Sequence, residues 1–195
     1  YAALWFIQPC IQNGCNAMFS KTSVITKMKF PVSVLPATIW AKEFFNHLCM
    51  MLIAIVMLFM CGFFPNVYWL GLIYFTICSF MFVESVTLIL SVLTMLWRDV
   101  RKLVTSLMRM LMYFSPVIWE CHFAASVPFH NILNIIMKLN PVYYIVNGYR
   151  DCIFYNRWIF AHPAQTIYFW GVTIVLFVIG CMLMYKFKRK FIDLI

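Results

Sequence analysis

Residues 44–83 read FFNHLCMMLIAIVMLFMCGFFPNVYWLGLIYFTICSFMFV, and these forty residues contain no Asp, Glu, Lys or Arg. The run is interrupted only by Phe64-Pro65-Asn66, a sequence typical of a tight turn. An α-helix rises about 1.5 Å per residue and the hydrocarbon core of a bilayer is about 30 Å thick, so roughly 20 apolar residues span it. The stretch therefore predicts two membrane-spanning helices joined as a hairpin.

The composition of the whole chain agrees with a membrane protein. Hydrophobic residues make up 65% of the chain and charged residues 11%, whereas soluble domains carry about 25% charged residues. The formal net charge is +9, but the basic residues lie at the ends of apolar runs. This pattern is typical of an orientation signal and speaks against a nucleic-acid-binding surface.

The distribution of apolar runs along the chain predicts an all-α integral membrane fold with a single transmembrane domain over residues 1–195. The chain begins with Tyr1 inside an apolar stretch, and we expect it to be N-terminally incomplete. Pro116 interrupts one apolar run, because proline lacks the backbone donor that a helix interior needs. Five transmembrane helices are predicted, at about residues 1–20, 37–61, 67–96, 103–119 and 166–185.

The distribution of Lys and Arg predicts the orientation of these spans. Three basic residues fall on one side, namely Lys138, Arg150 and Arg157. Twelve fall on the other side, namely Lys21, Lys27, Lys29, Lys42, Arg98, Arg101, Lys102, Arg109, Lys186, Lys188, Arg189 and Lys190. Because positive charge accumulates on the cytoplasmic side, we expect a multi-pass membrane protein with a cytoplasmic C-terminus.

The outer region holds two apolar pieces that are too short to span a bilayer. Residues 130–139 form the first piece, and residues 142–154 form the second. Asn140-Pro141 between them is typical of a helix N-cap followed by proline at the first helical position. We expect outer re-entrant helices within residues 130–155, and an ordinary amphipathic external loop is the alternative.

Two helical faces carry polar side chains at membrane depth. Gln8, Gln12 and Asn16 recur every four residues in the first span, and Glu84 heads a similar face that continues through Thr87 in the third span. Such groups must face protein or water. They either join neighbouring helices by hydrogen bonds or line a hydrophilic path for a polar substrate.

Two charged residues inside predicted spans are candidates for the substrate path. Glu84 is protonated, paired or beside water, because an isolated carboxylate is costly in a bilayer. Arg109 lies about two turns inside the boundary formed by Arg101 and Lys102. It either extends back to the interface or meets an anionic substrate, since a guanidinium binds phosphate through two parallel hydrogen bonds.

Aromatic residues near the Pro116 break complete the predicted path. Tyr113, Phe114 and Trp119 either belong to an interfacial belt or stack on sugar rings. The chain has no catalytic constellation, no metal-ligand spacing and no phosphate-binding G-x-x-x-x-G-K-[ST] loop. We therefore expect no cofactor in this chain, and whether it takes part in an enzymatic reaction stays open.

Four sequence motifs follow one another along the chain. They are Lys27-Met28-Lys29-Phe30-Pro31 with Leu35-Pro36, Arg98-Asp99-Val100, Phe114-Ser115-Pro116-Val117-Ile118-Trp119, and Asn140-Pro141-Val142-Tyr143-Tyr144 with Gly148-Tyr149-Arg150. In this order they resemble the permease subunits of polysaccharide-exporting ABC transporters (type-2 ABC permeases), most closely teichoic acid translocation permeases of the TarG/TagG type. The resemblance runs from the second span of that family to its C-terminus.

The resemblance implies six spans in the complete subunit and a working unit of two permeases with two separate P-loop ATPase subunits, which hold ATP and Mg²⁺. It implies that the substrate is a lipid-linked polyanionic cell-wall polymer, wall teichoic acid, and O-antigen or capsule export is the alternative. It implies an outer gate at Pro116, Asn140, Pro141, Tyr144 and Arg150. The implied ATPase-coupling helix comprises Ser23, Val24, Ile25, Thr26, Lys27, Met28, Lys29 and Phe30.

The sequence is also compatible with other functions. Residues 23–30 are short, basic and amphipathic, which suits a docking helix but also a plain positive-inside loop. An ABC permease for a lipid or a drug would also keep a docking helix. An integral membrane transferase would need a pair of catalytic His or Asp residues, and a channel or scaffold would need no docking segment.

Overall fold

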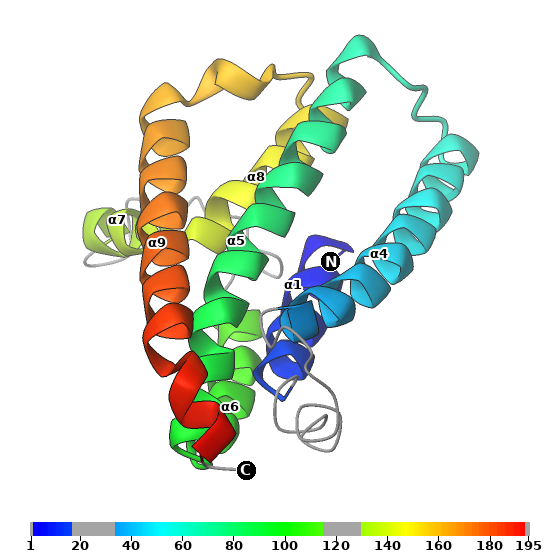
Figure 1. Ribbon diagram of the computed structural model, residues 1–195. Helices are drawn as coiled ribbons and strands as arrows, with labels where there is room; N and C mark the ends of the chain where they lie inside the picture. Colours follow the sequence, from blue (N-terminus) through cyan, green and yellow to red (C-terminus); the bar gives the residue numbers. More distant parts are fainter. Residues whose placement is uncertain (1, 17–33, 115–129, 194–195) are drawn as a thin grey trace.

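The computed structural model describes residues 2–16, 34–114 and 130–193, and in these ranges the chain is built of helices and short connections (Figure 1). The all-α fold class is thereby confirmed for the described residues. The predicted coupling residues 23–30, Pro116 and Trp119 lie outside them. The elements are α1 (Ala2–Cys15), α4 (Val34–Met60), the 3₁₀ helix η1 (Val67–Trp69), α5 (Leu70–Leu96), α6 (Val100–Phe114), α7 (His130–Leu139), α8 (Pro141–Ile153), η2 (Ile159–Ala161) and α9 (Pro163–Asp193).

Three of the described helices are long and apolar enough to cross a membrane. The qualifying stretches are Ala41–Met60 in α4, Val67–Leu96 across η1 and α5, and Pro163–Phe187 in α9. The described parts of α1 and α6 have 14 and 15 residues, which is shorter than the roughly 20 residues of a span. Five spans therefore stay a prediction for the whole chain.

Helix α5 is the centre of the bundle, with α9 along one side and α1, α4, α6 and α8 packed around the rest (Figure 1). Its buried side chains include Leu72, Phe75, Cys78 and Phe82. Helices lie close together where one of them has a glycine at the contact. A Cβ on Gly14 of α1 would overlap the methyl group of Thr87, so these two helices meet with little side chain between them.

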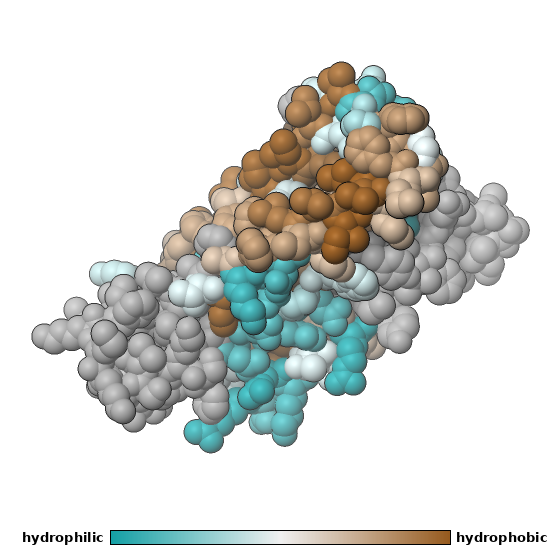
Figure 2. All heavy atoms as spheres, turned by 90° about the vertical axis from the view of Figure 1, so that its right-hand side faces the viewer, coloured by the Kyte–Doolittle hydropathy of each residue, from teal (hydrophilic) through white to brown (hydrophobic). Residues whose placement is uncertain are grey.

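The two ends of the bundle differ in character. The turn at residues 61–66 and the connection from α8 to α9 lie at one end, and the C-terminal part of α9 and the turn at residues 97–99 lie at the other (Figure 1). The second end carries exposed Arg98, Arg101 and Lys102. Figure 2 shows an apolar surface toward the first end and hydrophilic side chains below it. Which end faces the cytoplasm stays a prediction.

Two helix boundaries can be compared with the sequence expectations. Asn140 caps α8, since its side-chain oxygen accepts a 3.0 Å hydrogen bond from the Val142 backbone N–H, and Pro141 follows at the helix start. This confirms the predicted N-cap. Helix α9 runs to Asp193, past the expected end near residue 185. Lys and Arg are good helix formers, so the basic residues after Tyr185 continue the helix.

Candidate functional site

Helix α8 forms the centre of the candidate site because its polar side chains reach three of the surrounding helices. Its capped start at Asn140 fixes the helix, and Tyr144, Gly148 and Tyr149 are buried. A Cβ on Gly148 would overlap the ring of Phe75, so the α8 backbone lies directly against α5. The predicted gate residue Tyr144 is thus an interior residue of the bundle.

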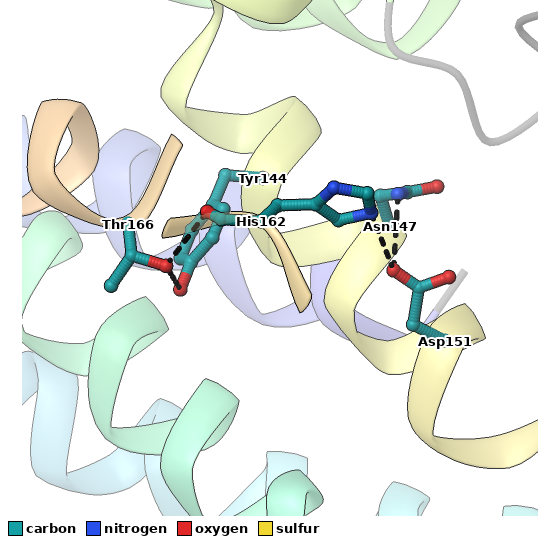
Figure 3. A network of polar contacts seen from close by, with 5 residues as sticks. All are labelled: Tyr144, Asn147, Asp151, His162 and Thr166. Atoms are coloured by element: carbon teal, nitrogen blue, oxygen red, sulfur yellow. Dashed lines mark hydrogen bonds and ion pairs between the residues drawn. The ribbon is translucent and has the colours of Figure 1, made fainter. Parts of the chain in front are cut away.

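A first chain of hydrogen bonds joins α9, α5 and α8. Thr166 donates to the His162 carbonyl at 3.1 Å, so its oxygen accepts from the Tyr144 hydroxyl at 3.0 Å (Figure 3). Tyr144 in turn accepts from Tyr74 at 3.4 Å, and Tyr74 accepts from the Trp170 indole N–H at 2.9 Å. All the donors point the same way along this chain, an arrangement in which each bond polarises the next.

A second chain joins α4 to α8 and α5. The Thr76 hydroxyl donates to the Leu72 carbonyl at 2.7 Å, so it accepts from Tyr149 at 2.8 Å. The Tyr149 oxygen then accepts from Nε2 of buried His47 at 3.4 Å, which assigns the proton to that ring nitrogen. Because His47 belongs to α4, a movement of α4 relative to α5 would strain its hydrogen bond with Tyr149 of α8.

A third cluster links the end of α8 to the start of α9. Asp151 is buried and lies 3.6 Å from Nε2 of His162, and Asn147 donates to Asp151 at 3.4 Å (Figure 3). Burial raises the pKa of the Asp151 carboxyl, and the charges of His162 and Arg157 oppose this rise. The adjoining cavity of about 10 Å³ has room for about one water molecule and none for a sugar.

A polar bracket between α1 and α4 was not among the residues singled out from the sequence. Glu43 of α4 is buried and accepts hydrogen bonds from Asn13 of α1 at 3.0 Å and from Asn46 at 3.3 Å. The spacing of Glu43 and Asn46 on one helical face is visible in the sequence, but the approach of Asn13 depends on the packing of α1 against α4.

The predicted path residues of α1 lie on a half-buried face. Gln8, Gln12 and Asn16 are all partly accessible, and Asn16 donates to the Gln12 carbonyl at 3.0 Å. Glu84 of α5 is also half-buried, and among the described residues its Oε2 atom has no hydrogen-bond partner. Buried Cys10 lies within electrostatic range of both Glu84 and Glu43, so the two carboxylates flank the same part of α1.

The remaining predicted path residues are on or beyond α6. Arg109 is exposed there, away from the core formed by Val104 and Met108. The side chains of Tyr113 and Phe114 lie outside the described part of the structure. Within residues 2–16, 34–114 and 130–193, no three His, Cys, Asp or Glu side chains group closely enough to hold a metal ion.

Comparison with known proteins assigns the family. The family model for the ABC-2 type transporter matches residues 1–154, from before α1 to the end of α8. The chain belongs to the ABC-2 type transporter family. This ABC-2 chain is 27% identical to an O-antigen export system permease protein RfbA of Klebsiella pneumoniae, over 98% of the chain and 71% of that protein. It is also 20% identical to an O-antigen export system permease protein RfbA of Myxococcus xanthus, over 84% of the chain and 62% of that protein.

The matched region of this ABC-2 permease contains part of the polar contacts described above. The bracket of Asn13 and Glu43 and the helix α8 with Tyr144 fall inside residues 1–154, whereas His162 and Thr166 follow it. Among the described side chains, hydrogen bonds join α8 to α4, α5 and α9.

Proposed function

We propose that this chain is the membrane permease of an ATP-driven exporter that moves a lipid-linked polysaccharide from the cytoplasmic to the outer side of a bacterial plasma membrane. The observation that carries the proposal is the relation, over 98% of the chain, to a permease named for O-antigen export. The family match and the three long apolar helices support the same assignment.

The exported polymer is proposed to be polyanionic. The resemblance of the four motifs to teichoic acid permeases favours wall teichoic acid, which is rich in phosphate, and the relatives named for O-antigen export favour O-antigen as the second candidate. Arg109, exposed on α6, would attract phosphates on the cytoplasmic side. The half-buried amides of α1 would contact sugar hydroxyls without holding them tightly.

A separate P-loop ATPase is proposed to drive the movement by binding residues 23–30. This segment connects α1 to α4 along the chain, and the hydrogen bond between Asn13 and Glu43 joins those two helices. A displacement of the segment would therefore reach both helices together. A second copy of the permease completes the path, because five or six helices scarcely enclose a polymer.

Helix α8 is proposed to act as the outer gate. Tyr144 and Tyr149 connect it to α9, α5 and α4, so a rigid-body shift of these helices would change its position. In this proposal the gate opens when the ATPase displaces the coupling segment.

Depletion of the permease in its native cells tests the proposal. We expect lipid-linked polymer to accumulate on the cytoplasmic side, and expression of the full permease should clear it. The phosphate and sugar content of the accumulated material separates teichoic acid from O-antigen. Normal surface polymer with no internal accumulation would contradict the proposal.

A further inference from the structure

Within the described residues, polar side chains attach α8 to the start of α9 at two points that differ in chemistry (Figure 3). The first is the hydrogen bond of 3.0 Å between the hydroxyls of Tyr144 and Thr166. The second is the contact of 3.6 Å between Asp151 and Nε2 of His162. Tyr144 and Asp151 are seven positions apart in one helix, so the two attachments lie about 10 Å from each other along α8.

The attachment at Tyr144 does not change its charge near neutral pH. Burial raises the pKa of the Tyr144 hydroxyl above its ordinary value of 10, and the Thr166 hydroxyl is uncharged. The Tyr144 ring also packs against the ring of buried Phe169 of α9, with 4.9 Å between the ring centroids. We therefore expect this end of α8 to stay attached to α9 in acidic and in alkaline solution.

The attachment at Asp151 depends on the charge of His162. A distance of 3.6 Å exceeds the roughly 3.2 Å of an ordinary N–H···O hydrogen bond, so a neutral imidazole contributes little and an imidazolium forms an ion pair. Asp151 is buried, and it also accepts a long hydrogen bond of 3.4 Å from Asn147. Histidine side chains ordinarily change their charge between about pH 5 and 8. Loss of the imidazole proton thus leaves a buried carboxylate with weaker partners.

The other groups around this contact do not change their charge in the same pH range. Arg157, in the connection between α8 and α9, attracts the Asp151 carboxylate but stays charged throughout. Burial raises the pKa of the neighbouring Cys152 thiol to about 11, so the thiol stays neutral. The residues that α5 and α9 contribute to the adjoining cavity, Phe75 and Gln165, are uncharged.

A second imidazole contacts α8 from another direction. Nε2 of His47 in α4 lies 3.4 Å from the Tyr149 hydroxyl. Tyr149 and Asp151 are two positions apart, and an α-helix turns by about 200° over two residues, so the two contacts lie on opposite sides of α8. His47 is therefore the matched control for a pH effect that acts through Asp151.

We propose that the contact between Asp151 and His162 is a pH-controlled latch, which holds the end of α8 against the start of α9 while the imidazole is charged and releases it when the imidazole loses its proton. The attachment of Tyr144 to Thr166 persists, so α8 pivots about its Tyr144 end. In the proposed exporter, acidity on the outer side keeps the gate closed. This consequence rests on the proposed role of α8 as the outer gate, whereas the latch itself does not.

Hydrogen exchange of the backbone amides in residues 148–162 tests the latch, with the full permease in lipid nanodiscs. The unmodified protein and His162→Gln are compared at the same pH, so that the chemical pH dependence of exchange cancels. At about pH 6 the unmodified protein should exchange about threefold more slowly, an effect typical of an ion pair with an exposed partner, and at about pH 8 the two should be equal. The same difference should remain when both proteins also carry His47→Gln.

Asp151→Asn gives the second arm of the test. When both proteins carry this substitution, His162→Gln should change the exchange at neither pH, because the carboxylate that holds the imidazolium is absent. Equal exchange of the unmodified protein and His162→Gln at pH 6, a difference of the same size at pH 6 and pH 8, or a difference that survives Asp151→Asn would overturn the latch. None of these outcomes bears on the export proposal, since polymer transport is not measured.

Discussion

Asn13 of α1 and Glu43 of α4 are joined by a hydrogen bond of 3.0 Å although thirty positions separate them in the chain. Residues between them include the predicted ATPase-docking segment 23–30. Asn46 donates a further hydrogen bond to the same carboxylate. The bracket therefore holds together the two helices that lead into and out of that segment.

Glu43→Ala should loosen this bracket. The loss of hydrogen bonds to a buried charged group lowers the free energy of unfolding by about 1.5–3 kcal/mol, and we expect less transport per ATP hydrolysed. Thermal unfolding and a coupled transport assay measure the two effects. Lys42→Ala is the matched control, because Lys42 is the exposed neighbour. In a double-mutant cycle Asn13→Ala should add little to Glu43→Ala, and full additivity would show that the two side chains act independently.

Gly14→Ala should disturb the contact between α1 and α5. The new methyl group would overlap Thr87, and such overpacking costs typically about 1–3 kcal/mol. Thr87→Ala should restore part of the lost thermal stability by removing the opposing methyl group. Gly171→Ala on α9 is the control, since within the described part of the chain no atom of another element lies within 4 Å of its Cβ position. Equal losses from Gly14→Ala and Gly171→Ala would argue against the close approach.

Asp151 should make stability depend on pH. Burial raises the pKa of its carboxyl above the ordinary value of 3.8, so the folded protein holds the proton more tightly than the unfolded chain does. Its contribution to stability is therefore fully present below the ordinary pKa and is lost as pH rises through the folded-state pKa. The side chain of Asp151→Asn stays neutral at every pH. As pH rises through the folded-state pKa of Asp151, the melting temperature of this variant should therefore increase relative to that of the unmodified protein.

The comparison is cleanest with His162→Gln in both proteins, because the imidazole that faces Asp151 is then absent. Asp99→Asn on the exposed turn at residues 97–99 is the control. The predicted dependence would be refuted if the melting temperatures of the proteins with Asp151 and with Asn at position 151 changed with pH in parallel over the whole range.

Arg109→Ala should lower polymer transport by about tenfold while the ATPase still assembles with the permease, if one charge-assisted contact with phosphate is lost. Lys102→Ala, which removes another exposed charge two turns earlier on α6, should have a smaller effect. Transport rates and co-purification of the ATPase are measured side by side. Unchanged transport in Arg109→Ala at normal expression would remove this residue from the path.

The apolar runs and the Asn140-Pro141 cap were sufficient to predict the helical class and the start of α8, because both depend on local sequence. The contact of Tyr149 with His47 and Thr76 was not predictable, since it joins residues about seventy to one hundred positions apart. Glu43 was also missed as a functional candidate. A carboxylate near the start of an apolar run is usually exposed, and only the packing of α1 buries it.

Reconstitution into vesicles tests the central claim most directly. The full permease and its ATPase are inserted with lipid-linked polysaccharide, and the appearance of polymer on the side opposite the ATPase is followed with and without ATP. We predict ATP-dependent movement that is lost when residues 24–28 are scrambled, while the ATPase subunit still hydrolyses ATP on its own. Movement that is equal with and without ATP, or a permease that purifies from its native membrane with no ATPase bound, would contradict the account.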